Sequence, residues 1–372
     1  MHDSTLLSLC SATAHDDLLP VSDYISLCMP EPPRSITELD DVASRPVDDV
    51  IQTLERIDGD IVVAGAGGKM GFHLCRMLRR VFDSTGSCHE VIAVSRFSDP
   101  TTREAFEQGG IRTLSLDLTD EKNVARMPDA QALVFLAGIK FGTSDSPETL
   151  RLFNETMPAL VADRYAGIPT VALSTGCVYP FVTPESGGCT ENDPAAPAGT
   201  YAVSCLGRET AFTDSRRAHG TPISLIRLNY SVDLRYGVLV DLALKVFSEE
   251  PVDVSMGYFN CVWQGDAIRY TIRSLEHAAA APDPFILNVT GGQILSVRDV
   301  AERFGMLFNK PVTIEGTEAD SAWLNDAGKS HRLFGNPDVE EDTLIEWVAD
   351  WIQNNRPLLG KPTHFEVRDG NY

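Results

Sequence analysis

The sequence predicts an α/β fold in which a doubly wound parallel sheet is followed by a smaller C-terminal lobe. Short apolar runs typical of buried strands alternate with amphipathic stretches up to residue 227. Such alternation is typical of a parallel sheet with helices on both faces. Beyond residue 230 the pattern changes to loops and scattered helical stretches. A chain of 372 residues is long enough for one large domain or for a domain with a smaller lobe.

The elements can be placed in chain order. Residues 1–34 mix small polar residues with prolines, so we expect an extension without a fold of its own. Ser35 and Glu38 match a capping box that opens a short helix, and a second helix is expected over residues 47–56. The strand candidates are residues 61–65, 90–94, 111–115, 132–137, 169–174 and 223–227.

The C-terminal lobe has two clear elements. Residues 285–289 form an apolar run, which suggests that the lobe is built partly from segments returning to the first domain. Residues 341–353 predict a terminal helix. Its two tryptophans, Trp347 and Trp351, stand four residues apart, and packing in the core explains that spacing better than a binding role.

A glycine-rich turn joins the first strand to the amphipathic stretch after it. Gly65, Gly68 and Gly71 have the spacing G-x-x-G-x-x-G, which is typical of a Rossmann-type dinucleotide-binding fold. Glycine lets the backbone approach the pyrophosphate, and the helix N-terminus supplies N–H groups and a positive dipole. The alternative is a tight turn in an unrelated α/β protein. The residues expected to bind the cofactor here are Gly65, Gly67, Gly68, Lys69, Met70 and Gly71.

The end of the second strand favours NADP over NAD. Proteins that bind NAD usually place Asp or Glu there for the ribose 2′-hydroxyl, whereas this chain has Ser95 and Arg96. Serine and arginine suit a 2′-phosphate that a carboxylate would repel. The alternative for Arg96 is a solvated loop cation. After the third strand, Asp117 and Leu118 are expected near the adenine, and Asp120 is a candidate helix cap.

The composition excludes several classes of function. The formal net charge of −22 disfavours nucleic acid and anionic membrane lipid as partners, because both need a basic surface. No apolar run approaches the roughly 18 residues that span a membrane. No histidine or cysteine spacing predicts a metal site. Scattered cysteines and the lack of a signal-peptide pattern predict free thiols in a cytoplasmic protein.

Further motifs follow the later strands and establish a family resemblance. They are Leu136-Ala137-Gly138-Ile139-Lys140, Asn154, Leu173-Ser174-Thr175-Gly176-Cys177-Val178-Tyr179, Tyr201, Arg227-Leu228-Asn229 and Asp326-Ala327-Gly328-Lys329. In this order and spacing, over about residues 60–353, the chain resembles the extended short-chain dehydrogenase/reductases. This is the NAD-dependent epimerase/dehydratase family, which includes UDP-galactose 4-epimerase.

The resemblance implies a role for several side chains. Thr175 takes the position of the catalytic Ser or Thr that hydrogen-bonds the substrate oxygen, and Tyr201 takes that of the general acid/base. Lys140 would lie near the nicotinamide ribose and phosphates, and Asn229 on the substrate side of the cleft. The residues implied to line the cofactor in this part are Leu136, Ala137, Gly138, Lys140 and Tyr201.

The motif around Tyr201 departs from the family pattern. Cys205 stands where the family's Tyr-x-x-x-Lys has its lysine, which holds the nicotinamide ribose and lowers the pKa of the tyrosine. The resemblance offers Lys140 as the nearest replacement cation. Cys205 itself is expected to be a small buried hydrophobe, with a redox or catalytic thiol as the alternative.

A second departure concerns the substrate. Phe259 aligns with an arginine that binds the diphosphate in nucleotide-sugar members of the family, although Arg235 and Arg269 lie nearby in the sequence and could compensate. Phe259 and Trp263 are therefore expected either to stack on a sugar ring or to belong to the core.

Three functions remain open at this stage. The first is an NAD(P)-dependent oxidoreductase that moves a hydride to or from a small, carbohydrate-like carbinol or carbonyl. The second is a nucleotide-sugar epimerase or dehydratase. The third is a non-catalytic NADP-binding sensor or scaffold, which the missing lysine favours and the retained Thr175 and Tyr201 disfavour. We expect an extension (1–34), a Rossmann domain (35–230), a lobe for the substrate (231–372) and, from the family, a homodimer.

Overall fold

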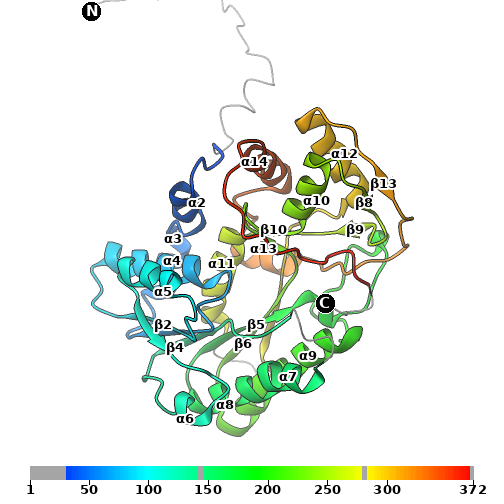
Figure 1. The fold of residues 1–372 in the computed structure, drawn as a ribbon. Helices are drawn as coiled ribbons and strands as arrows, with labels where there is room; N and C mark the ends of the chain where they lie inside the picture. Colours follow the sequence, from blue (N-terminus) through cyan, green and yellow to red (C-terminus); the bar gives the residue numbers. More distant parts are fainter. Residues whose placement is uncertain (1–30, 141–145, 279–282, 369–372) are drawn as a thin grey trace, which may run out of the picture. The chain divides into compact units, whose positions relative to one another are not determined.

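A seven-stranded parallel sheet forms the centre of the fold (Figure 1). The computed structural model describes residues 31–140, 146–278 and 283–368. Nearly all of the expected extension therefore lies outside the described residues. The strand order is β11-β6-β5-β4-β1-β2-β3. The strands are β1 (Ile61–Ala64), β2 (Val91–Ser95), β3 (Arg112–Ser115), β4 (Ala132–Phe135), β5 (Thr170–Thr175), β6 (Ile223–Leu228) and β11 (Phe285–Val289).

The predicted fold class is confirmed by this sheet. Six strands lie at the predicted positions, and β11 returns from the C-terminal part of the chain to pair with β6, with Leu287 opposite Ile226. The strand order reverses between β1 and β4, and ligands of doubly wound sheets bind at the carboxyl ends of the strands beside such a reversal.

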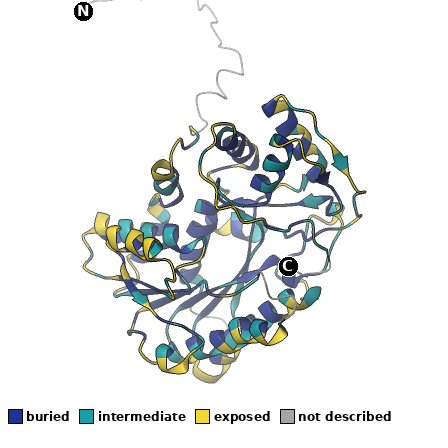
Figure 2. Ribbon diagram, viewed as in Figure 1, coloured by how far each residue is buried: buried dark blue, intermediate teal, exposed yellow. Residues whose placement is uncertain are grey.

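Helices cover both faces of the sheet because successive residues of its strands point to opposite sides and most of them are apolar. In β1, Ile61 and Val63 pack against one set of helices, and Val62 and Ala64 pack against another. The first set is α3 (Asp48–Leu54), α4 (Gly71–Thr85), α5 (Pro100–Gln108) and α11 (Gln264–Arg273). The second is α6 (Glu121–Val124), α8 (Met157–Arg164) and α9 (Gly199–His219). Figure 2 shows the buried strands and the exposed outer face of α5.

A continuous helical segment precedes β5. It begins with α7 (Pro147–Arg151), passes through a wider π turn, η1 (Leu152–Thr156), and continues as α8. Such single π turns inside helices are frequent at functional sites. Short 3-10 turns occur at η2 (Gly176–Val178), η3 (Pro184–Ser186) and η4 (Ser274–His277).

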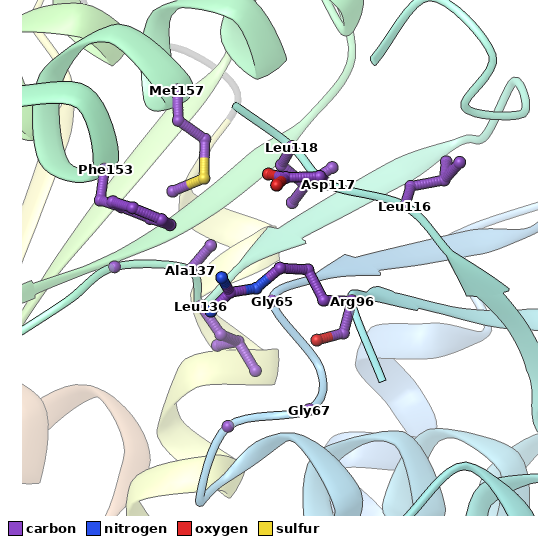
Figure 3. Close-up of a pocket in the computed structure, with 13 residues that line it drawn as sticks. Gly65, Gly67, Arg96, Leu116, Asp117, Leu118, Leu136, Ala137, Phe153 and Met157 are labelled. Carbon is purple, nitrogen blue, oxygen red and sulfur yellow. The ribbon is translucent and has the colours of Figure 1, made fainter. Parts of the chain in front are cut away.

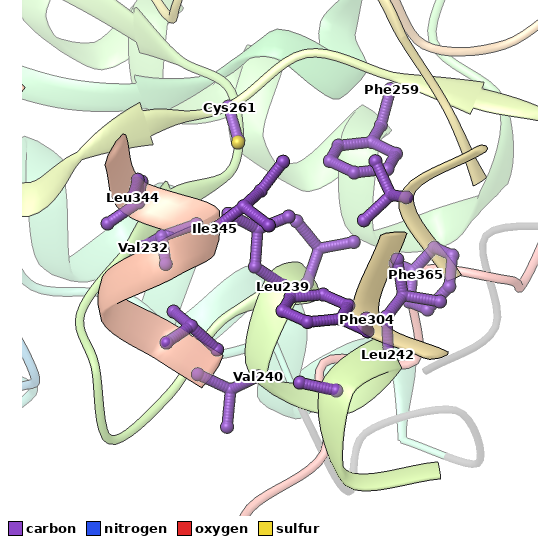
Figure 4. Packing of buried hydrophobic residues seen from close by; sticks show 14 of the residues in the cluster. Val232, Leu239, Val240, Leu242, Phe259, Cys261, Phe304, Leu344, Ile345 and Phe365 are labelled. Atoms are coloured by element: carbon purple, nitrogen blue, oxygen red, sulfur yellow. The ribbon is translucent and has the colours of Figure 1, made fainter. Parts of the chain in front are cut away.

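A second core lies in the C-terminal part of the chain (Figure 4). Its helices are α10 (Val238–Phe247), α12 (Val297–Phe308) and α14 (Glu341–Gln353), and α13 (Gly328–Phe334) packs near β11. Three pairs of two-residue strands complete it: β7 (Ser231–Val232) with β10 (Val262–Trp263), β9 (Tyr258–Phe259) with β12 (Leu295–Ser296), and β8 (Val252–Asp253) with β13 (Ile314–Glu315). The predicted helix at 341–353 is confirmed, and its two tryptophans are buried.

The N-terminal helices connect the two cores. Ser35 caps α2 (Ile36–Ala43) by accepting from the Glu38 N–H, as the capping box predicts, while the Glu38 carboxylate accepts from the Arg34 N–H. Leu39 of α2 packs in the C-terminal core, although it precedes the sheet in sequence. The predicted domain boundary near residue 230 stays a prediction. α2 lies before this boundary in sequence and packs in the C-terminal core, whereas β11 lies after it and pairs with the central sheet. Among the described helices, none is long and apolar enough to cross a membrane.

Candidate functional site

Three adjoining cavities lie at the carboxyl ends of the strands. The first cavity follows β1, β2, β3 and β4 and is lined by residues from Gly65 to Met157. The middle cavity shares Gly65 and Gly138 with the first and also contains Lys69 and Lys140. The inner cavity shares Lys140 with the middle one and follows β5 and β6. Because each cavity shares lining residues with the next, the three together form one cleft.

The glycine-rich turn brings the backbone close to its neighbours. Gly65 has a φ of +84°, in the left-handed region, and a Cβ there would overlap the backbone of Ala137. A Cβ on Gly71 would overlap the backbone of Ala66, and α4 begins here without a side-chain cap. The first turn of a 15-residue helix thus faces the cleft, which suits the diphosphate of a dinucleotide.

Figure 3 shows the first cavity, which contains the predicted Ser95, Arg96, Asp117 and Leu118. The Arg96 guanidinium lies 5.5 Å from the centroid of the Phe153 ring. The N–H and the hydroxyl of Thr119 both donate to Asp117, and together with nearby Arg96 they lower the pKa of that carboxyl. The site is therefore polar at its rim and apolar on the side of Phe153.

Phe153 and Met157 were missed by sequence reasoning. They reach the first cavity from η1 and from the first residue of α8, where the helix widens. No pattern of apolar residues distinguishes such a turn from an ordinary helix. The cap predicted for Asp120 is confirmed, because its carboxylate accepts from the Lys122 N–H at the start of α6.

The inner cavity brings together Thr175, Tyr201, Asn229 and Lys140, as the resemblance implies. Thr175 Oγ1 accepts from the Cys177 N–H at 3.2 Å, which leaves its hydroxyl hydrogen to donate elsewhere. The buried Asn229 amide is held in place and donates to Asn260 Oδ1 and to the carbonyl of Trp323. Residues of the inner cavity that the sequence motifs did not indicate are Tyr230, Ser231, Tyr236, Gly237, Val238 and Thr363.

Cys205 is fully buried beside Tyr201 and packs with Val178, Tyr179 and Cys189, as expected of a small hydrophobe. A side-chain hydrogen bond links Tyr201 and Cys205. Burial raises the pKa of the Cys205 thiol, and it raises the pKa of Tyr201 well above its usual value. A tyrosine in this setting needs a cation nearby before it can ionise.

Arg208 provides such a cation on α9, one helical turn after Cys205. Arg208 is 6% exposed, and its guanidinium donates to the Leu173 carbonyl at 3.0 Å and to Asn154 Oδ1 at 2.6 Å. Its charge lowers the pKa of both Tyr201 and Cys205, against the larger opposite effect of burial. A Cβ on Gly138 would overlap the guanidinium, which therefore lies directly behind the lining of the cleft.

No carboxylate among the described residues forms an ion pair with Arg208. The adjacent Glu209 is bound to Arg227 through two hydrogen bonds of 2.9 and 2.7 Å and also accepts from Ser174. Asn154 Oδ1 is a neutral acceptor, and its amide N–H groups donate to the carbonyl of Ile139 and to Ser204. Arg208 is therefore a buried positive charge beside the cleft without a counter-ion in the described part of the chain.

Lys140 connects the middle and inner cavities. Its Nζ lies 5.8 Å from the centroid of the Tyr201 ring and 3.4 Å from the carbonyl oxygen of Thr363, to which it donates. Burial lowers the pKa of Lys140. Lys140 therefore lines both cavities, and it loses its positive charge more readily than an arginine would.

Phe259 and Trp263 lie in the C-terminal core. Phe259 is 0% exposed and Trp263 is 2% exposed, and neither lines the three cavities (Figure 4). Of the two expectations, the structure supports core packing. Arg235 donates to the Asp233 carboxylate, and Arg269 donates to the Asp338 carboxylate. Neither arginine is therefore placed to bind a diphosphate in place of the arginine that Phe259 replaces.

The described part of the chain contains free cysteines and no cluster of possible metal ligands. Six cysteines are free, namely Cys75, Cys88, Cys177, Cys189, Cys205 and Cys261, while Cys10 and Cys28 lie outside the described residues. Within residues 31–140, 146–278 and 283–368, no group of three or more His, Cys, Asp or Glu residues is arranged to hold a metal ion.

The family model described as "NAD dependent epimerase/dehydratase family" matches residues 61–231. The resemblance expected from the motifs is thereby confirmed, and the matched range runs from β1 to the first residue of β7. The sequence has no significant match among curated proteins.

Solved structures share the fold over most of the chain. UDP-glucuronic acid 4-epimerase from Bacillus cereus, solved with UDP-glucuronic acid and NAD, has a TM-score of 0.64 at 18% identity and covers 80% of this chain and 99% of its own. The dTDP-glucose 4,6-dehydratase DesIV from Streptomyces venezuelae, solved with NAD, has a TM-score of 0.67 at 20% identity, covering 80% and 98%. At this identity the likeness shows the fold alone.

Proposed function

We propose that the protein is an NAD(P)-dependent oxidoreductase that acts on a carbinol or carbonyl of a sugar or sugar-derived molecule. The observation that carries the proposal is one continuous cleft, with a glycine-rich turn at the helix N-terminus in its first part and Thr175, Tyr201 and Lys140 in its inner part. When bound, the cofactor supplies a hydride acceptor or donor.

The residues that would hold the cofactor follow the cleft. Gly65 to Gly71 would bind the diphosphate, Asp117 and Leu118 would lie at the adenine end, and Leu136 to Gly138 would line the middle. Thr175 would donate to the substrate oxygen, and Tyr201 would exchange a proton with it. Asn229, held by Asn260 and Trp323, would border the substrate.

Arg208 would supply the positive charge that the family's lysine normally gives to the tyrosine. Three observations support this role: its guanidinium is buried, it has no carboxylate partner in the described structure, and its charge acts on Tyr201. A guanidinium keeps its charge at any physiological pH, whereas burial lowers the pKa of Lys140. Lys140 would then serve mainly to bind the ribose or a phosphate.

NADP is the proposed cofactor, with NAD as the alternative. The end of β2 carries Ser95 and Arg96 rather than a carboxylate, and both line the first cavity. Fluorescence titration with NADPH and NADH tests this directly. Tighter binding of NADPH, lost in Arg96→Glu, would support the assignment. Equal or tighter binding of NADH would overturn it, and failure to bind either dinucleotide would overturn the proposed function itself.

A nucleotide-sugar epimerase or dehydratase is the second candidate. In its favour, several solved structures of the same fold bind NAD with a nucleotide-sugar, including the B. cereus epimerase. Against it, Phe259 is buried in the core, and Arg235 and Arg269 are engaged elsewhere. Cofactor that stays bound through purification would favour the epimerase, because such enzymes regenerate it in place. If the protein binds a dinucleotide but turns over no carbohydrate, the remaining hypothesis is a non-catalytic NADP sensor.

We also propose a cytoplasmic location and a homodimer. The six free thiols of the described residues suit a reducing compartment, where disulfides are rare. The dimer is an expectation from the family, and sedimentation velocity tests it.

A further inference from the structure

Three lysines from distant parts of the chain line the middle cavity. Lys69 follows the glycine turn, Lys140 follows β4, and Lys361 belongs to the chain after α14. The whole protein carries a formal charge of −22, so a cavity lined by three lysines has a charge opposite in sign to that of the molecule as a whole. Cavities lined by one sign of charge concentrate ligands of the opposite sign.

Anchors on both sides of Lys361 hold it over the cavity. Before it, the Leu359 N–H donates to the Arg235 carbonyl at 3.1 Å. After it, the N–H and hydroxyl of Thr363 donate to Asp241 at 2.7 and 2.6 Å, and the Thr363 carbonyl accepts from Lys140. Phe365 is 2% exposed in the C-terminal core. Figure 1 shows this segment in red, running from α14 toward the middle of the molecule.

The charges of the three lysines act on one another. Burial, then the charges of Lys361 and Lys140, lower the pKa of Lys69 to about 7, while Asp241 opposes them. The Lys69 ammonium lies 3.0 Å from the centroid of the Tyr236 ring, and Tyr236 lines both the middle and the inner cavity. Asp241 and Glu366 act against burial on the pKa of Lys140, so three lysines and two carboxylates lie around the junction of the two cavities.

We propose that the middle cavity is an oxyanion site in which Lys69, Lys140 and Lys361 together bind a phosphate or carboxylate group. The inference deepens the proposed function, since the anion belongs either to the diphosphate of the dinucleotide or to an acidic group of the substrate, as in a sugar acid or sugar phosphate. The role of Lys361 means that a segment outside the matched family domain completes the cleft.

The test uses the full-length protein with Lys361→Gln and Lys69→Gln. The matched control is Lys122→Gln, because Lys122 is an exposed residue of α6 and undergoes the same change of charge away from the cleft. One arm measures dissociation constants for NADH and ADP-ribose by fluorescence and calorimetry. The other arm measures binding of sulfate and gluconate, with neutral glucose as the comparison, both without dinucleotide and with dinucleotide at saturation.

Removing one of the clustered cations should weaken binding of the anion about tenfold, a typical loss for a charge-assisted contact. A loss for NADH and ADP-ribose identifies the diphosphate as the anion, and a loss for sulfate or gluconate at saturating dinucleotide identifies the substrate. Unchanged binding in both arms would overturn the oxyanion site. If wild-type protein binds no dinucleotide, the proposed function fails, while the sulfate and gluconate titrations without dinucleotide still decide whether the lysines form an anion site.

Discussion

The first cavity and the inner cavity of the cleft are assembled in different ways. The first cavity depends mainly on β1, the glycine turn and the ends of β2 to β4, which follow one another within residues 61–138. The inner cavity takes Thr175 from β5, Tyr201 from α9 and Thr363 from the chain after α14. The first cavity keeps the glycine turn of the family pattern, whereas Cys205, which replaces the family's lysine, lies beside Tyr201 of the inner cavity.

This difference shows how a protein can alter a catalytic motif without losing its fold. A glycine turn has few substitutes, because its backbone leaves no room for a side chain at Gly65 or Gly71. A positive charge near a tyrosine can come from any element that reaches it. The following four experiments test that contrast, from the largest expected effect to the smallest.

Replacing the hydroxyl of Tyr201 should have the largest effect. Tyr201→Phe removes the proposed proton donor and acceptor and keeps the ring, so turnover of a carbohydrate substrate should fall about 10²- to 10⁴-fold. Dinucleotide affinity should change little, because the glycine turn is untouched. Steady-state kinetics and NADPH titration measure the two quantities. Full turnover by Tyr201→Phe would remove the tyrosine from the mechanism and favour a different acid/base.

Variants of Arg208 test whether this arginine supplies the positive charge that the family's lysine normally provides near the tyrosine. Arg208→Met should lower turnover about tenfold or more and shift the tyrosine-dependent limb of the pH–rate profile to higher pH, since a nearby cation favours the ionised tyrosine. Arg208→Lys should restore part of the rate and move the limb back. A loss of rate without any shift of the limb, together with a lower melting temperature in both variants, would show that Arg208 only supports the packing of Asn154 and Leu173.

Variants of the glycine turn test the first cavity, which is built from segments close together in sequence. Gly65→Ala places a Cβ against Ala137 at a φ of +84°, so NADPH affinity should fall at least about tenfold. Gly86→Ala is the matched control, because Gly86 also has a positive φ, +69°, at the end of α4, and nothing lies within 4 Å of its Cβ. The control should lose about 1 kcal/mol of stability and keep its affinity. Equal affinities of the two variants would contradict a close approach of ligand to this turn.

The pH dependence of anion binding gives the smallest effect. The pKa of Lys69 is lowered to about 7 by burial, by Lys361 and by Lys140, with Asp241 opposing and Tyr236 beside it. A bound anion raises that pKa again, so sulfate affinity should be full below pH 7 and should fall at most about tenfold per unit as the pH rises above 7. Titrations from pH 6 to pH 9 measure this. Lys69→Arg should bind sulfate with little change over the same range.

The sequence predicts the features that neighbouring residues determine. The strands, the glycine turn, the cap at Ser35 and the burial of Cys205 all depend on local pattern or on general hydrophobicity. An arginine seven residues after Tyr201 lies on the same face of a helix, so the sequence did hold a signal for Arg208. Recognising it required knowing that Glu209 is already bound to Arg227.

Other features depend on contacts between distant segments and leave no local signal. Lys140 and Thr363 are 223 residues apart, and no spacing rule connects them. Phe259 and Trp263 have the composition of a sugar-stacking pair, and only the packing of α10, α12 and α14 around them decides that they are core. The π turn that brings Phe153 into the first cavity likewise depends on tertiary packing.

The strap formed by residues 357–368 is synthesised late, so the part of the cleft that it contributes is the last to become available for ligand binding. All seven strands of the sheet have been synthesised once β11 ends at Val289, and Lys361 follows 72 residues later. At a synthesis rate of about 5–20 residues per second, that interval lasts roughly 4–14 s. Ligand therefore cannot stabilise the chain through all three lysines until Lys361 and its anchors have been synthesised.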